Sequence, residues 1–261
     1  MRILIYLLLP FLLATNLFAQ SLSPRQIENN LHTSYQQILH HRFDADSIAW
    51  DSVQIANNHF RTLFKDYTAH YPKTLTYPFD SLRTDKIDIV TSKDNLFRIY
   101  SWDTWTGGSM HSFENITQYK FNKQVYSKLI HDTTTVSEGD YIPFYSQIFT
   151  LSTSNRTYYL AIANGIYSSE DASQSVRIFS VENGLINDTT KLIKTKSGFT
   201  NSIRINFNVS NPINRPKSVA SLITYIPSKR ILSIPVVYEN GFVTKRYIRY
   251  QFTGTYFERM K

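Results

Sequence analysis

Residues 203–209 read Ile-Arg-Ile-Asn-Phe-Asn-Val, an alternation of apolar and polar side chains. Successive side chains of an extended strand point to opposite faces, so the isoleucines, phenylalanine and valine would share one face. Arg204, Asn206 and Asn208 would occupy the other face. A period of two over seven residues predicts a β-strand with one buried side.

The same period recurs on both sides of this stretch, from about Lys86 to the C-terminus. Tyr and Phe suit the half-buried surface of strands, and the chain holds 18 Tyr and 17 Phe. Asn183-Gly184 and Asn240-Gly241 each separate two apolar runs and can take the positive φ of a hairpin turn. The other expected strands are Phe97–Trp102, Ile116–Phe121, Phe144–Leu151, Tyr158–Ala163, Val176–Val181, Val219–Ile226, Ile231–Tyr238 and Arg246–Phe252.

No long helical pattern separates these strands, so the pattern predicts an antiparallel sheet. About ten strands of this kind could form a sandwich, a barrel or an irregular propeller. No motif recurs at a fixed period that would decide between these three.

A helical hairpin is expected before the strands, over residues 20–72. Ser23-Pro24-Arg25-Gln26 offers an N-cap, a proline at the first helical position and the glutamine of a capping box. Pro72 would end the second helix. Two apolar sets recur at helical spacing on either side of a junction near Asp44–Ser47: Ile27, Leu31, Tyr35, Ile38 and Leu39, then Val53, Ala56, Phe60, Leu63, Phe64 and Tyr67. We therefore expect three parts, with residues 73–261 as an antiparallel β domain.

Residues 1–19 have the layout of a cleavable export signal. Arg2 gives a positive start, an apolar run follows from Ile3 to Leu13, and Ala19 supplies the small residue that a signal peptidase needs. We expect cleavage after Ala19 and a periplasmic or secreted mature protein. The apolar run is too short for a membrane anchor, and the absence of cysteine excludes disulfides and a lipidated N-terminal Cys.

Charge is unevenly distributed along the chain. Residues 191–261 hold 13 Lys or Arg against Glu239 and Glu258, a net of 13 − 2 = +11, whereas the whole chain carries +8. Such a basic stretch indicates an anionic glycan or another exported protein as a partner of the C-terminal strands rather than nucleic acid. The alternative is that these cations are solvated positions that keep strand edges from associating.

The segment Ile99–His111 holds two of the three tryptophans. Trp102 and Trp105 flank Asp103 at the expected end of a strand, and Gly107-Gly108 permits a tight reversal or the close approach of a ligand. Aromatic rings beside a carboxylate and the imidazole of His111 are suited to a sugar. We therefore name Trp102, Asp103, Trp105 and His111 as candidate ligand-binding residues; the alternative is a hairpin with core tryptophans.

This segment and a later one also carry a resemblance. The stretches IYSWDTWTGGSMHSFENITQYK and YYLAIANGIYSSEDASQSVRIFSVENGLIND resemble segments of uncharacterised exported bacterial proteins. The resemblance covers most of the chain from about residue 86. It implies no activity and no catalytic residue.

The remaining candidates are weaker. Glu170 and Asp171, in the polar stretch 167–174, could ligate a hard cation, but their spacing fits no calcium loop. Asp103 and Glu114 could be nominated as the two carboxylates of a glycosidase. The chain contains no metalloprotease, nucleophile-elbow, phosphate-loop or dinucleotide motif, and we expect no metal and no cofactor.

The preferred function is therefore a non-catalytic β domain that binds a glycan or another protein. One alternative is a hydrolase of envelope polysaccharide that uses Asp103, with Trp102 and Trp105 as platforms. Another is an assembly factor that docks an exported protein through its basic strands.

Overall fold

The computed structural model describes residues 22–42, 47–130, 142–209 and 222–261. The predicted export signal lies outside these ranges. The helices are α1 (Pro24–His41), α2 (Ser47–His70), the 3-10 turn η1 (Pro72–Leu75) and α3 (Asp80–Thr84). The strands are β1 (Asp88–Thr91), β2 (Phe97–Asp103), β3 (Phe113–Phe121), β4 (Gln124–Leu129), β5 (Phe144–Ser152), β6 (Thr157–Ile166), β7 (Asp171–Glu182), β8 (Leu185–Asn187), β9 (Ile193–Thr195), β10 (Gly198–Thr200), β11 (Ser202–Asn208), β12 (Thr224–Ile226), β13 (Ile231–Val237), β14 (Val243–Phe252) and β15 (Phe257–Arg259).

The N-terminal helices form as the sequence predicts. The side chain of Ser23 accepts from the main-chain N–H of Gln26, whose amide oxygen accepts from the Ser23 N–H at 2.9 Å, which completes the capping box. The predicted apolar faces of α1 and α2 are buried, and α2 ends at His70, just before Pro72. The two helices pack against each other and against β2 and β3.

The strands make three sheets. The N-terminal sheet has the order β1-β2-β3-β4, the middle sheet β11-β7-β6-β5 with β8 beside β7, and the C-terminal sheet β10-β9-β15-β14-β13-β12. The pairs are antiparallel, as predicted, except that β15 runs parallel to β9. The prediction of a mainly β fold with an N-terminal helical pair is confirmed.

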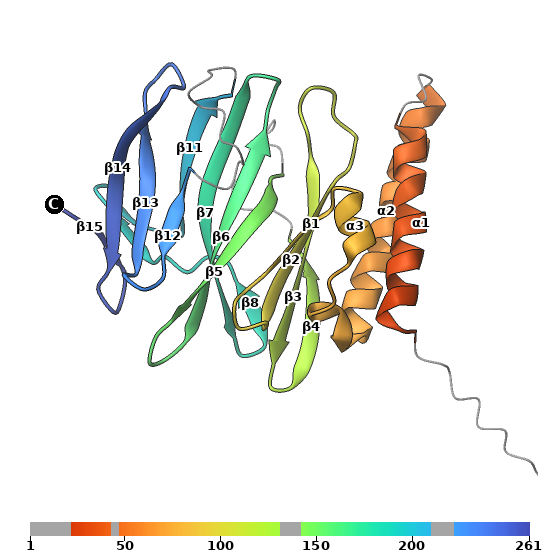
Figure 1. Cartoon of the computed structure of the whole chain (residues 1–261), viewed down its shortest axis with the longest axis horizontal. Helices are drawn as coiled ribbons and strands as arrows, with labels where there is room; N and C mark the ends of the chain where they lie inside the picture. The colour runs from red at the N-terminus through yellow and green to blue at the C-terminus, as the bar shows by residue number, and fades with distance from the viewer. Residues whose placement is uncertain (1–21, 43–46, 131–141, 210–221) are drawn as a thin grey trace, which may run out of the picture.

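The sheets are stacked, and the helices cover one end of the stack (Figure 1). One core joins the helices to the N-terminal sheet, with Phe64 against Tyr100. A second core joins the N-terminal and middle sheets, where the Phe97 and Tyr159 rings stack at 4.6 Å. A third core joins the middle and C-terminal sheets. This layering agrees with the sandwich alternative rather than with a barrel or a propeller.

The stacking of the sheets explains why some strands do not alternate between buried and exposed residues. β2 is buried along its whole length because the helices cover one of its faces and the middle sheet covers the other. β6 is also buried on both faces, because it lies between the N-terminal sheet and the C-terminal sheet. The Asn183-Gly184 turn has positive φ at both residues, 53° and 78°, as a two-residue hairpin requires.

Among the described residues, no helix combines the length and apolar character needed to cross a membrane.

Candidate functional site

Trp102 is a core residue, and its proposed role as a sugar platform is wrong. Its side chain is 0% exposed, with its ring 5.1 Å from that of Phe60 and 5.8 Å from that of Phe64. The register pairs Trp102 with Glu114 on the neighbouring strand, on a sheet face covered by α2. No surface of the indole is left for a ligand.

Asp103 and His111 lie together, as the sequence suggests, but they bond to each other. One carboxylate oxygen of Asp103 accepts the main-chain N–H of Trp105 at 2.9 Å, and the other lies 2.5 Å from Nδ1 of His111. The main-chain N–H of His111 donates to Ile166 at the end of β6. Asp103 is buried, and both of its oxygens are used to fix the loop between β2 and β3.

Trp105 is half-buried at the edge of the helical layer. Its φ is 55°, a left-handed conformation that Asp103 stabilises by accepting its N–H. Its indole nitrogen donates to the Tyr35 hydroxyl at 3.2 Å, and the guanidinium of Arg42 lies 4.0 Å from the ring centroid. Burial raises the pKa of the Tyr35 phenol, so this hydroxyl stays protonated. Trp105 thus attaches the loop to α1.

The Gly107-Gly108 pair serves the loop itself. A Cβ at Gly107 would lie 1.9 Å from the main-chain oxygen of Met110, whereas a Cβ at Gly108 would have no atom within 4 Å. Position 107 therefore requires glycine because the chain reverses tightly there. A tight reversal is one of the two roles that the sequence allows for the glycine pair.

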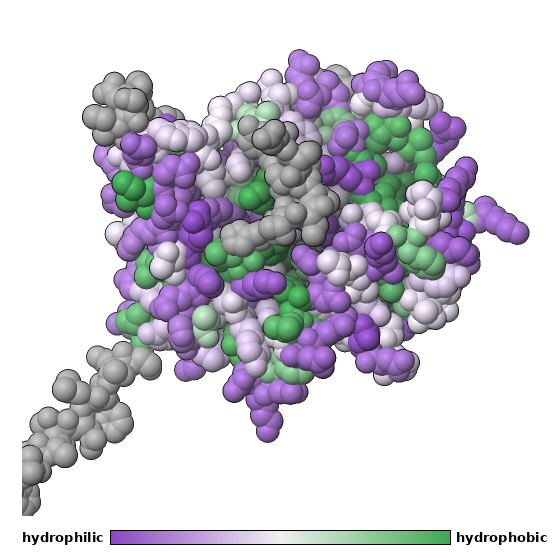
Figure 2. Space-filling view, turned by 180° about the vertical axis from the view of Figure 1, so that it is seen from behind, coloured by the Kyte–Doolittle hydropathy of each residue, from purple (hydrophilic) through white to green (hydrophobic). Residues whose placement is uncertain are grey.

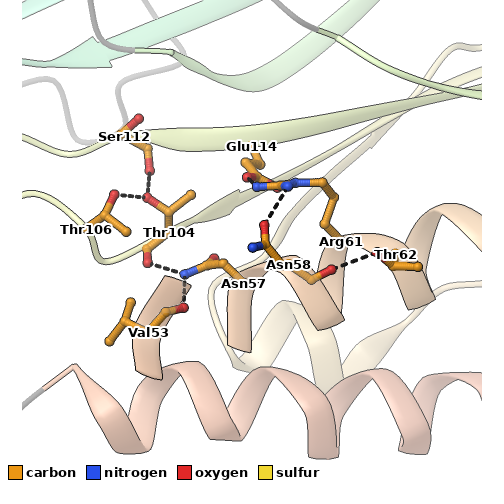
Figure 3. A network of polar contacts seen from close by, with 9 residues as sticks. All are labelled: Val53, Asn57, Asn58, Arg61, Thr62, Thr104, Thr106, Ser112 and Glu114. Atoms are coloured by element: carbon orange, nitrogen blue, oxygen red, sulfur yellow. Dashed lines mark hydrogen bonds and ion pairs between the residues drawn. The ribbon is translucent and has the colours of Figure 1, made fainter. Parts of the chain in front are cut away.

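Polar contacts tie the same region to α2 (Figure 3). The buried amide of Asn57 donates to the main-chain oxygens of Val53 and Thr104, and the Thr104 hydroxyl donates to Ser112. One turn further along α2, the Arg61 guanidinium bonds both oxygens of Glu114, with Nε to Oε2 at 2.6 Å. This hydrogen-bonded partner raises the pKa of Arg61.

These contacts argue against a glycosidase built on Asp103 and Glu114. The first carboxylate is used by Trp105 and His111, and the second is neutralised by Arg61. A general acid or base needs an oxygen that can reach the substrate. Neither side chain offers one in this arrangement.

The second polar stretch is a tight turn followed by strand. Its residues 171–174 belong to β7, and the Ser168 hydroxyl accepts the main-chain N–H groups of Glu170 and Asp171. No cluster of three metal-ligating side chains occurs within the described ranges. The turn geometry accounts for these polar residues without a cation.

A groove that the sequence did not indicate opens between β11 and the β13–β14 hairpin. Its volume is about 1,020 Å³. Aliphatic and aromatic side chains from all three strands line it, among them Ile203, Ile205, Phe207, Ile234, Val237 and Ile248. Figure 2 shows apolar side chains gathered in the upper right of the molecule, where the C-terminal strands lie. The alternation in residues 203–209 predicts the apolar face correctly, but not that part of this face borders a groove.

The outer face of the C-terminal sheet carries the exposed cations Lys194 and Arg249. Leu232 and Ile234 on β13 face the core together with their paired residues on β14. Tyr247 and Arg249 alternate with those paired residues along β14 and therefore face outward. Tyr247 is 43% exposed, and Arg249 is exposed beside it. Across the sheet, Lys194 pairs with Glu258 at 2.9 Å. The exposed ring of Phe199 contacts the half-buried ring of Tyr256 on the same side, and Lys194 lies 5.4 Å from the Tyr256 ring.

No protein-family model matches the chain, and a search of curated proteins gives no significant match. The resemblance to uncharacterised exported bacterial proteins therefore stays a prediction.

Proposed function

We propose that this chain is an exported, non-catalytic binding protein that holds an anionic glycan on the outer face of its C-terminal sheet. One observation carries the proposal: this face combines exposed cations with exposed aromatic rings. Tyr247 and Arg249 are two residues apart on one strand, about 7 Å along the sheet. A sugar ring can stack on the first while its acidic group pairs with the second.

The charge of the face is largely uncompensated within its own stretch of sequence. Residues 191–261 contain two carboxylates, and Glu258 is paired with Lys194. Glu239 lies in the turn between β13 and β14, away from the centre of the sheet. Arg249 on this face, and the exposed Lys245 at the irregular start of the same strand, are therefore available to a polyanion, whose attraction salt would weaken.

Binding fits better than hydrolysis. Hydrolysis of a glycoside needs two available carboxyl groups facing each other across the sugar. Asp103, the carboxylate that the sequence nominated, is fully engaged by its own loop. A sheet face whose described carboxylate, Glu258, is already paired with Lys194 is suited to holding a polymer rather than to cleaving it.

The test is a titration with heparin, as a sulfated glycan, and polygalacturonate, as a carboxylated glycan, with neutral dextran as the reference. We expect both anionic polymers to bind and to weaken as salt rises. Lys245→Ser combined with Arg249→Ser should reduce affinity at least tenfold, about 1.4 kcal/mol. Tyr247→Ser, which changes no charge, should also weaken binding if a sugar ring stacks there.

The matched control is Lys65→Ser combined with Lys123→Ser, which removes the same charge from exposed positions on α2 and the β3–β4 turn. An equal loss with the control would mean that net charge, not this face, attracts the polymer, and would refute the proposal.

Export is tested separately. The protein is expressed with its N-terminus intact and the secreted or periplasmic fraction is sequenced. Cleavage after Ala19 predicts Gln20 as the first residue, whereas an intact Met1 would contradict it.

A further inference from the structure

The groove between β11 and the β13–β14 hairpin has a strand edge as one of its walls. β11 is the terminal strand of the middle sheet, and within the described part of the chain its sheet neighbour is β7 alone (Figure 1). The opposite wall is aliphatic, with Ile234, Val237 and Ile248. A site of about 1,020 Å³ is at the upper end of the range of ligand pockets.

The register of β11 shows which main-chain groups face the groove side. The N–H of Val209 donates to Glu170, and the carbonyl of Asn201 accepts from Ile178, so odd-numbered residues bond toward β7. Even-numbered residues therefore direct their N–H and C=O to the open edge.

The two ends of this edge are already used. Ser202 bonds the Thr200 hydroxyl through both its N–H and its C=O, and the N–H of Asn208 donates to Gly241 at 3.0 Å. Asn206, between them, has no described partner for its outward N–H and C=O. Among the described residues, the open part of this edge is thus short and consists of the outward N–H and C=O of Asn206.

The rim of the groove is acidic in an otherwise basic region. Two exposed carboxylates, Asp171 and Glu239, line it together with one cation, Arg204. Glu239 is one of the two carboxylates in a stretch of net charge +11. A ligand that carries positive charge complements this rim, in contrast to the anionic glycan proposed for the outer face.

We propose that this groove binds a short extended peptide of another protein, which adds as a strand to β11. Main-chain hydrogen bonds to Asn206 would hold the peptide, and alternate aliphatic side chains would lie against Ile234, Val237 and Ile248. A Lys or Arg of the peptide pairs with the carboxylates of the rim. The inference does not depend on the glycan site, because the groove lies between the two sheets and not on the outer face.

The probe is a short capped peptide of alternating valine and lysine, titrated into the full mature chain by NMR. We expect saturable binding and a slowing of hydrogen exchange at the Asn206 amide of at least tenfold. A peptide with glutamate in place of lysine should bind at least fivefold more weakly, and Glu239→Gln should reduce that preference.

The decisive variant is Asn206→Pro. Proline removes the outward N–H without breaking a bond to β7, a position where sheets tolerate proline. We expect the variant to keep its unfolding midpoint within a few degrees and to lose at least tenfold in peptide affinity. Asn206→Ala, which keeps the N–H, is the matched control and should bind like the wild type.

Failure of the wild type to bind the probe overturns the proposal, as does equal binding by Asn206→Pro. Binding of a fatty acid or an apolar dye that ignores residue 206 would assign the groove to a small apolar ligand and also overturn it. If Asn206→Pro unfolds, exchange at the Asn206 amide of the wild type decides: protection by the peptide supports strand addition, and unchanged exchange refutes it.

Discussion

Replacement of Trp102 by alanine should cost about 3–5 kcal/mol of unfolding free energy, the usual range for deleting a buried large aromatic side chain. Trp102 is 0% exposed and packs edge-on against Phe60 in the core between the helices and the N-terminal sheet. A domain of this size has a total stability of roughly 5–15 kcal/mol, so the variant would lose a large part of it. Its midpoint of thermal unfolding should fall by about 6–20 °C.

Trp102→Phe separates the two contributions to that cost. It removes about one five-membered ring, roughly 40 Å² of buried area and about 1 kcal/mol of transfer free energy. The indole N–H has no hydrogen-bond partner among the described residues, and leaving such a group buried costs about 1–3 kcal/mol, which phenylalanine would remove. The two effects oppose each other, so Trp102→Phe should change stability by less than about 1 kcal/mol.

Urea unfolding followed by far-ultraviolet circular dichroism measures both variants without using tryptophan fluorescence. The matched control is Trp50→Ala, because the side chain of Trp50 is 53% exposed. Its free energy of unfolding should stay within about 0.5 kcal/mol of the wild-type value. If Trp102→Ala also stays within that margin, the indole is not part of the core, and the argument that removes it from the ligand site is wrong.

Three further predictions test the contacts around the loop and one half-buried carboxyl, that of Asp88. Burial raises the pKa of Asp88 to about 6, against an opposing effect of Arg83, so the folded state favours the protonated acid. The stabilisation that protonated Asp88 contributes is fully present below about pH 4 and is lost as the pH rises through about 6. Asp88→Asn should therefore stabilise the protein by about 1–3 kcal/mol at pH 8 and have little effect at pH 4. Urea unfolding at both pH values measures this difference. Asn57→Ala leaves the carbonyl of Thr104 without its donor and should cost about 1–3 kcal/mol, whereas His59→Ala, at an exposed position of the same helix, should cost less than about 0.5; equal losses would contradict the buried bond. Gly107→Ala should lower the thermal midpoint and expose the loop to protease, while Gly108→Ala should not, and protease resistance in both would exclude the tight reversal.

The N-terminal helices and the main strands could be predicted from local patterns. The capping box at Ser23 and the turn at Asn183-Gly184 each depend on a few neighbouring residues, and both form as expected. Six strands were missed: β1, β8, β9, β10 and β15 have three or four residues, too few to show a period, and the six residues of β4 do not alternate regularly between apolar and polar. The stacking of three sheets was also hidden, since a strand covered on both faces, such as β2, shows no alternation.

The sequence groups the candidate residues in one segment but does not show which contacts they make. The sequence places Asp103, Trp105 and His111 in one segment, and the structure brings the three side chains together. What the sequence could not show is that α1 and α2 pack against this segment, through Tyr35 and Asn57. These contacts are long-range, and no local spacing reports them.

Residue type alone cannot separate a binding loop from a well-fixed one. A loop between two buried strands must satisfy its main-chain polar groups, and Asp, His and Gly are the residues that do so at a tight reversal. The same residue types bind sugars, so the sequence alone makes the segment around Asp103 resemble a binding site. A better criterion is whether a polar group or an exposed side chain still lacks a partner. Both oxygens of Asp103 are used. Among the described residues, by contrast, the outward main-chain groups of Asn206 and the exposed side chains of Tyr247 and Arg249 have no partner, and it is there that a ligand gains contacts without breaking any.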